Sequence, residues 1–218
     1  LDKDAAIERI IGMTRYPDAA WEPGPFEKTG YAGLTLNAVR GVICHSMVGS
    51  YAAAKSRLDG PDRASWQFSV LKNGDVIQHY ETAAVCWHAG VKTINGMFVG
   101  IEHEGGGPGN EREPLTLGQL AASVKLVRWL GETHSFPLNR EHLREHNEFY
   151  PTACPSGRIP WEEYMGPTKE EFGALFAYVQ RLDAATKFLI QTTINLARQV
   201  YGNDSPEVDT LKERVEAL

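Results

Sequence analysis

Short apolar or alternating runs occupy the middle of the chain and predict β-strands. Residues 39–46 contain the short apolar run Val42-Ile43-Cys44, which is typical of a buried strand, and residues 99–104 are another candidate strand. Residues 65–71 alternate between polar and apolar side chains, and Asn73-Gly74 then marks a tight turn into a further strand over residues 76–80. The clearest hairpin of the chain is therefore predicted at residues 65–80.

Helical patterns follow in the second half of the chain. Residues 116–133 begin with a threonine and carry apolar side chains at helical spacing. The segment 168–200 opens with a capping-box pattern, and a shorter helix is predicted over 206–217. Residues 21–36 are rich in Pro and Gly and predict an irregular loop. This order of elements predicts an α/β or α+β sheet covered by helices, followed by a helical tail.

Composition and charge narrow the classes of function. The 218 residues are 42% hydrophobic and 23% charged, so the chain should fold, and its length lies between one ordinary domain and two. A formal charge of -6 argues against nucleic acid as a partner. Residues 1–20 contain no apolar stretch long enough for a secretory signal, and charged residues interrupt the apolar segment 172–200, so neither export by a signal peptide nor a membrane span is predicted.

Histidine and cysteine spacing suggests a metal site. Three cysteines, Cys44, Cys86 and Cys154, are too few and too widely spaced for a small disulfide framework. His45 ends an apolar strand, and His146 precedes Cys154 by eight positions across a loop that contains proline. Two imidazoles, one thiolate and an open fourth position are typical of a hydrolytic zinc site.

The ordered motifs of the chain resemble the zinc-dependent N-acetylmuramoyl-L-alanine amidases. The motifs are, in chain order, His45, Ser65-Trp66-Gln67-Phe68 with Asn73-Gly74, Trp87-His88-Ala89-Gly90, Gly100-Ile101-Glu102, and the segment from His146 through Cys154-Pro155-Ser156. The resemblance implies the fold of phage T7 lysozyme and the peptidoglycan recognition proteins, a mixed central β-sheet flanked by helices. It covers roughly residues 35–165. We therefore expect a zinc amidase catalytic domain over 1–166 and a helical C-terminal appendage over 167–218.

The same resemblance implies roles for single residues. It assigns zinc to His45, His146 and Cys154, and the general base to Glu102. His88 corresponds to a groove histidine that contacts substrate near the metal, beside Trp87.

The chain departs from the T7-type members at two positions. Trp66 stands where those members carry a tyrosine, and it cannot act as an acid or base, so we expect a groove wall or packing role. Thr152 stands where they carry a lysine. A threonine can donate only a neutral hydrogen bond to the tetrahedral oxyanion, which is weaker than the bond from a cationic lysine.

Other chemistry-bearing residues have plainer interpretations. Cys44 and Cys86 are expected to be buried on strands, and Glu104 shares a strand face with Glu102. The remaining histidines are expected to be structural or on the surface, and His142 is the hardest to exclude from the metal site; they are His79, His103, His134 and His142. The C-terminal helices could form a dimer seam, dock on the catalytic domain, or lead to a wall-binding module.

The predicted function is hydrolysis of the amide bond between N-acetylmuramic acid and L-alanine in bacterial cell-wall peptidoglycan. The lack of a signal peptide, taken with the resemblance, favours a phage endolysin that accumulates in the host cytoplasm before it reaches the wall. Three alternatives stay open: a cytoplasmic muropeptide-recycling amidase, a non-catalytic peptidoglycan-binding module, and a structural zinc site closed by His142 or His88.

Overall fold

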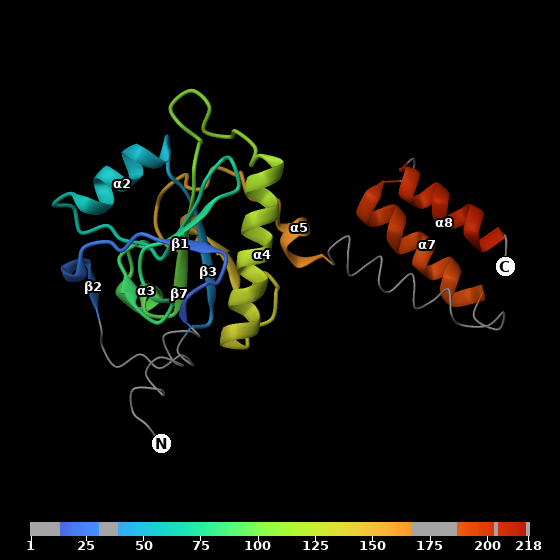
Figure 1. Cartoon of the computed structure of the whole chain (residues 1–218), viewed down its shortest axis with the longest axis horizontal. Helices are drawn as coiled ribbons and strands as arrows, with labels where there is room; N and C mark the ends of the chain where they lie inside the picture. The colour runs from blue at the N-terminus through green and yellow to red at the C-terminus, as the bar shows by residue number, and fades with distance from the viewer. Residues whose placement is uncertain (1–13, 31–38, 167–186, 203–204, 217–218) are drawn as a thin grey trace, which may run out of the picture. The chain divides into compact units, whose positions relative to one another are not determined.

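A six-stranded mixed sheet forms the centre of residues 1–164 (Figure 1). Its strands are, in spatial order, β1 (Ala19–Trp21), β5 (Val76–Gln78), β4 (Phe68–Val70), β7 (Phe98–His103), β3 (Gly41–Ser46) and β8 (Leu143–Glu145). The strands β4, β7, β3 and β8 run parallel to one another, whereas β5 is antiparallel to β4. A separate antiparallel pair joins β2 (Thr29–Gly30) to β6 (Val85–Cys86). The mixed sheet expected from the sequence is confirmed.

The computed structural model describes residues 14–30, 39–166, 187–202 and 205–216. The chain divides into two compact units, and the boundary between them falls after Tyr164. The described helices of the first unit are α2 (Tyr51–Asp59), α3 (Lys92–Asn95), α4 (Leu117–His134) and the start of α5 (Trp161–Met165), with short 3-10 turns at η1 (Phe26–Lys28) and η3 (His146–Glu148).

Helix α4 covers one face of the sheet (Figure 1) and leaves the opposite face uncovered by a long helix. Leu126, Val127 and Leu130 of this helix share a buried cluster with Val42 of β3 and Ile101 of β7. Because successive strand residues point to opposite faces, Ile43, His45 and Glu102 project to the face away from α4. The chemistry-bearing residues of β3 and β7 therefore lie on the side that the long helix leaves uncovered.

The Asn73-Gly74 turn joins β4 to β5 and lies against the start of α4. Gly74 adopts φ +94, a left-handed conformation that glycine tolerates, and its amide donates to the carbonyl oxygen of Leu71. Thr116, the residue before α4, accepts a hydrogen bond from the amide of Gln119 and donates its own hydroxyl to the carbonyl oxygen of Lys72. The start of α4 is thereby tied to the predicted hairpin.

Several regions differ from the sequence prediction. Residues 21–36 were predicted as an irregular loop, yet the described part contains the end of β1, η1 and β2, because Trp21 pairs with Gln78 and Thr29 pairs with Cys86. Helices α2, α3 and α5 and strand β8 were not predicted, and no bounds were predicted for β6.

The second unit contains a helical hairpin. Helix α7 (Lys187–Tyr201) and helix α8 (Pro206–Glu216) pack through Ile194, Ala197, Val208 and Leu211. The predicted helix 206–217 is found as α8, and the predicted helix 168–200 is found from Lys187 onward, while residues 168–186 lie outside the described ranges.

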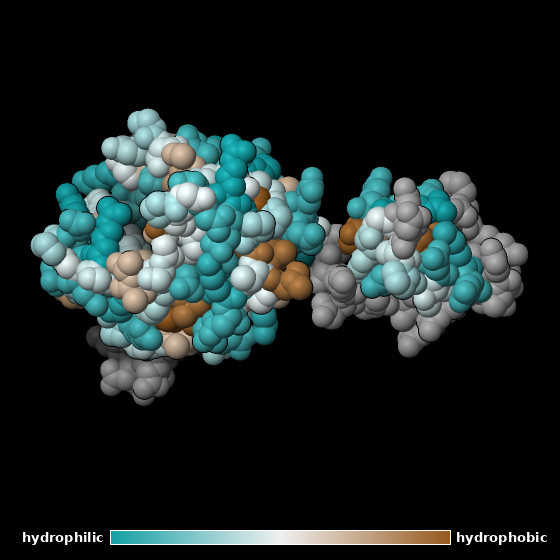
Figure 2. Space-filling model, turned by 90° about the horizontal axis from the view of Figure 1, so that it is seen from above, coloured by the Kyte–Doolittle hydropathy of each residue, from teal (hydrophilic) through white to brown (hydrophobic). Residues whose placement is uncertain are grey.

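The surface is mostly hydrophilic on the face shown in Figure 2, with only small apolar areas. Among the described residues, no helix combines the length and the apolar character that a bilayer crossing requires.

Replacing Thr116 by alanine should lower the free energy of unfolding by about 1–2 kcal/mol, because an N-cap and its link to the hairpin are lost. All five tryptophans lie within residues 1–164, so tryptophan fluorescence in urea follows this unit. Thr116→Ser retains the hydroxyl and serves as the control. Equal losses in the two variants would contradict this account.

Candidate metal centre and neighbouring carboxylate

The candidate site lies at the carboxyl ends of three parallel strands. His45 is the second-last residue of β3 and pairs in register with Glu102 of β7. On the other side of β3, Cys44 pairs with Glu145, the last residue of β8, and His146 follows directly. Because parallel neighbours lie only about 4.8 Å apart, the strand pairing itself brings His45, Glu102 and His146 together.

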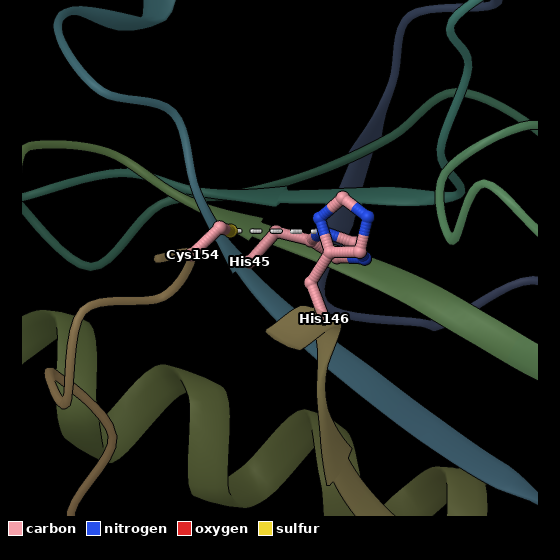
Figure 3. A group of neighbouring side chains, drawn as sticks. All are labelled: His45, His146 and Cys154. Atoms are coloured by element: carbon pink, nitrogen blue, oxygen red, sulfur yellow. Dashed lines mark hydrogen bonds between the residues drawn. The ribbon is translucent and has the colours of Figure 1, made fainter. Parts of the chain in front are cut away.

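Cys154 completes a group of three ligand-type side chains (Figure 3). The ligand atoms of His45, His146 and Cys154 all lie within 4.8 Å of one another. Nδ1 of His45 is 3.9 Å from Sγ of Cys154, and the rings of His45 and His146 have centroids 4.6 Å apart. The structure thus brings together the three residues to which the resemblance assigned the metal.

The loop between His146 and Cys154 is held closed by its own backbone. The amide of Asn147 donates to the carbonyl oxygen of Cys154 at 3.0 Å, and the amide of Ser46 on β3 donates to Sγ of Cys154 at 3.3 Å. The ring of Tyr150 stacks on that of His146 with centroids 5.8 Å apart. These contacts fix the side chains of both candidate ligands, His146 and Cys154, relative to the sheet.

Burial disfavours the charged forms of His45, His146 and Cys154, so the two imidazoles are favoured neutral and the thiol protonated. Burial lowers the pKa of His45 well below its ordinary value, and the neighbouring His88 and His146 lower it further. Burial raises the pKa of the Cys154 thiol to about 12. Nε2 of His146 is buried without a hydrogen-bond partner in the described part of the chain. Two imidazoles and one sulfur, with one orphaned nitrogen, fit zinc well.

Glu102 and Glu104 lie on the same stretch of chain but have different surroundings. Oε2 of Glu102 is buried and has no hydrogen-bond partner among the described residues, and burial raises the pKa of its carboxyl to about 7, although Arg57 and Arg158 oppose the shift. Both carboxylate oxygens of Glu104 instead accept backbone amides, from Tyr51 and Lys72. Glu102 therefore has an unpartnered carboxyl oxygen and a pKa near neutrality, whereas the carboxylate of Glu104 is occupied by backbone hydrogen bonds.

His88 and Trp66 are both buried, and for Trp66 this agrees with the packing role that was one of its two expected roles. Trp66 is 4% exposed, belongs to a buried cluster, and donates its indole N–H to Ser69. His88 is 8% exposed and lies between His45 and the carbonyl oxygen of Phe98, and burial lowers its pKa to about 4. The burial of Trp66 and His88 depends on residues distant in sequence, so the local motifs could not predict it.

Trp87 and Thr152 keep partly open positions. Trp87 is half-buried, and the guanidinium of Arg63 lies 4.1 Å from its ring centre. The hydroxyl oxygen of Thr152 accepts the amide of Cys154 at 3.2 Å, so Thr152 belongs to the ligand loop. Its hydroxyl hydrogen is not needed for that bond.

Two buried side chains hold the backbone around the candidate site: Arg158, which the sequence analysis did not single out, and His103, which it expected to be structural or on the surface. Arg158 is 3% exposed and donates to the Ser46 hydroxyl and to the carbonyl oxygens of Glu104 and Glu113, which ties the loop after β7 to the end of β3. His103 donates from Nδ1 to the carbonyl oxygen of His45. Only the arrangement in space identifies either residue.

The remaining histidines and cysteines take structural places. Cys44 on β3 and Cys86 on β6 are fully buried free thiols, as expected. His142 donates from Nδ1 to the carbonyl oxygen of Arg40 and stacks on Phe136, and both ring nitrogens of His88 are engaged. Among the described residues, neither histidine is therefore placed to be a fourth ligand, which argues against a closed structural site.

An open pocket of about 760 Å³ lies beside the ligand loop. Asn147 and Ala153, the neighbours of the two ligands on that loop, form one side. Asn110 and Arg112, from the Gly-rich loop between β7 and α4, form another.

Comparisons with known proteins agree with this geometry. A family model described as N-acetylmuramoyl-L-alanine amidase matches residues 35–157, more than half of the chain. Endolysin 2638A of Staphylococcus phage 2638A is 26% identical over 136 residues, which are 59% of this chain but only 28% of that protein. The chain thus spans about a quarter of the length of this curated relative.

Solved structures share the fold. An endolysin amidase, LysCS, from Clostridium intestinale URNW has a TM-score of 0.52 at 21% identity and covers 69% of this chain and 95% of its own. The Drosophila peptidoglycan recognition protein SD has a TM-score of 0.51 at 14% identity, over 69% of this chain and 92% of its own. At these identities the likeness concerns the fold.

The raised pKa of Glu102 predicts a pH-dependent stability of the metal-free protein. A carboxyl whose pKa rises from 4.5 to about 7 on folding stabilises the fold at low pH, and this contribution is lost as the pH rises through that window. Glu102→Gln should therefore gain about 2–3 kcal/mol of unfolding free energy over the wild type between pH 4.5 and 8. Urea unfolding at both pH values measures this gain, and an equal difference at both would refute it.

Proposed function

Because the chain belongs to the N-acetylmuramoyl-L-alanine amidase family, we propose that it hydrolyses the amide bond between the lactyl group of N-acetylmuramic acid and L-alanine in bacterial peptidoglycan. The observation that carries the proposal is the cluster of His45, His146 and Cys154 beside the unpartnered carboxylate of Glu102. The residues 1–166 form the catalytic domain in this proposal, and 167–218 form a helical appendage.

Zinc is the cofactor in this proposal, with His45, His146 and Cys154 as its ligands. Bound there, zinc would acidify a water molecule and polarise the scissile carbonyl, so that the amide is attacked without a covalent enzyme intermediate. The donor set supports zinc because it combines one soft sulfur with two imidazole nitrogens and has no fourth histidine or cysteine ligand within the described residues.

Glu102 is the general base. Its carboxylate, two strands from β8 and directly beside His45 in the sheet, accepts the proton of the attacking water and returns it to the amine that leaves. A pKa near neutrality suits both steps, because the group must first accept a proton and then donate it. The buried, unpartnered Oε2 atom supports this assignment over Glu104.

Thr152 and Trp87 act on the substrate in this proposal. The Thr152 hydroxyl, whose oxygen already accepts the Cys154 amide, has a hydrogen to donate to the developing oxyanion. Trp87 presents the exposed part of its ring as a wall for the glycan or peptide. The pocket between Asn147 and Arg112 receives the part of the peptidoglycan strand that lies away from the scissile amide.

The biological setting is phage-mediated lysis. The relative in Staphylococcus phage 2638A is named an endolysin, which supports synthesis in the host cytoplasm followed by attack on the cell wall. With a net charge of -6, wall binding depends on the groove or on another module and not on bulk charge. Self-association through the C-terminal helices stays a prediction; Leu196 and Val200, one turn apart on α7, are about half exposed.

Digestion of purified cell walls tests the proposal. We expect the protein to release new amino-terminal L-alanine, identified by mass spectrometry of the products, and to lose this activity with a zinc chelator and regain it with added zinc. The purified protein should contain one zinc per chain. Walls that are bound but not cut would favour a peptidoglycan-binding module, whereas cleavage of soluble muropeptides but not of intact walls would favour a recycling enzyme.

Glu102→Gln should lower kcat by at least about 100-fold and leave the zinc content unchanged, because it removes the base but no ligand. Glu104→Gln, two positions further along the chain and just after β7, is the matched control. We expect it to cost stability, since Glu104 accepts two backbone amides, but to retain most of the activity per folded molecule. Full turnover by Glu102→Gln would overturn the assignment of the base.

A further inference from the structure

His88 connects the metal-ligand candidate His45 to the backbone of β7. Nδ1 of His88 lies 3.0 Å from Nε2 of His45, and Nε2 of His88 lies 3.0 Å from the carbonyl oxygen of Phe98. The two imidazoles meet nearly edge to face, at an interplanar angle of 87°. The contact joins the Trp87-His88-Ala89-Gly90 motif directly to the ligand cluster.

The direction of these hydrogen bonds follows from the carbonyl group at one end. A carbonyl oxygen only accepts, so Nε2 of His88 carries the hydrogen of that contact. The ring is buried between other uncharged groups, and no carboxylate in the described ranges hydrogen-bonds to it, so His88 is neutral and its Nδ1 accepts. Nε2 of His45 must then be the donor.

The tautomer of His45 is fixed as a result. With its hydrogen on Nε2, the lone pair of His45 lies on Nδ1, the atom 3.9 Å from Sγ of Cys154. We propose that His88 is a positioning residue that holds His45 in this tautomer and orientation, with Nδ1 directed toward the metal. This inference rests on the proposed zinc site.

The surrounding structure is built to hold the His88 ring in place. A Cβ atom at Gly100 would lie 2.7 Å from Cγ of His88, so only glycine at this position of β7 leaves room for the imidazole. The side-chain oxygen of Asn95, which is buried, accepts the amides of His88 and Ala89 at 3.2 and 2.8 Å. Both the ring and the backbone of His88 are therefore fixed.

The arrangement explains why His88 and Gly90 occur together in the Trp87-His88-Ala89-Gly90 motif. Histidine ligands commonly give their second N–H to a carboxylate, a backbone carbonyl or water. Here a second imidazole takes that place and passes the contact on to the Phe98 carbonyl. Gly90, at φ +71, leaves room for Tyr150, which stacks on the other histidine ligand, so both ends of the motif support the same cluster.

Zinc affinity tests the proposal with a matched pair of variants. Leucine and asparagine have nearly the same shape, but only asparagine offers an acceptor oxygen near the position of Nδ1. In competition with a chromophoric chelator, His88→Leu should bind zinc about 10–100-fold more weakly than the wild type. His88→Asn should recover most of the affinity. Gly100→Ala, which displaces the ring without changing any ligand, should resemble His88→Leu.

The outcomes separate this inference from the proposed function. If the wild type binds zinc and His88→Leu binds it equally tightly, the role of His88 alone is overturned. Equal losses of affinity in His88→Leu and His88→Asn would overturn it as well. A wild type that binds no zinc would overturn the metal site as well.

A second measurement needs no variant of His88. Long-range proton–nitrogen NMR of the metal-free wild type reports which ring nitrogen of each histidine carries hydrogen. We expect His45 and His88 both as the Nε2–H tautomer. The Nδ1–H tautomer at His45 would overturn the proposal, whatever the variants show.

Discussion

The parallel pairing of β3 with β7 on one side and β8 on the other is the constraint on which the site depends. It sets Glu102 beside His45 and brings His146 next to them, although these residues are separated by up to about a hundred positions in the chain. A shift of one residue in either pairing would turn a ligand or the carboxylate toward α4 and its apolar cluster. Burial of Val42, Cys44 and Ile101 against α4 therefore stabilises the register that the chemistry needs.

Burial then determines the electrostatics. The imidazoles of His45 and His146 are favoured neutral, the thiol of Cys154 is favoured protonated, and the Glu102 carboxyl has a raised pKa, all mainly because charge is poorly solvated there. A divalent cation relieves most of these penalties together, since it favours the thiolate and the carboxylate and requires neutral imidazoles. The hydrogen bonds of His88 and His103 to the side chain and the carbonyl of His45 keep that ligand in place.

Sequence patterns predicted the elements with strong local signals and missed those that depend on partners. The hairpin at Asn73-Gly74 and helix α4 have turn and capping residues of their own, and both were found. The two-residue strands β2 and β6 exist only because Thr29 and Cys86 pair across the fold, which no local pattern reveals. At the site, spacing suggested His45, His146 and Cys154, and the structure brings these three together. The burial of Trp66, the link from His88 to His45 and the bonds of Arg158 required the three-dimensional arrangement, because each depends on residues distant in sequence.

The central claim is that His45, His146 and Cys154 hold one zinc ion at this edge of the sheet. X-ray absorption spectroscopy at the zinc edge of the purified protein tests it most directly. The account predicts one sulfur at about 2.3 Å, two imidazole nitrogens at about 2.0 Å and one further oxygen or nitrogen that is not from a cysteine. A shell without sulfur, with more than one sulfur, or with no change in the Cys154→Ser variant would contradict it.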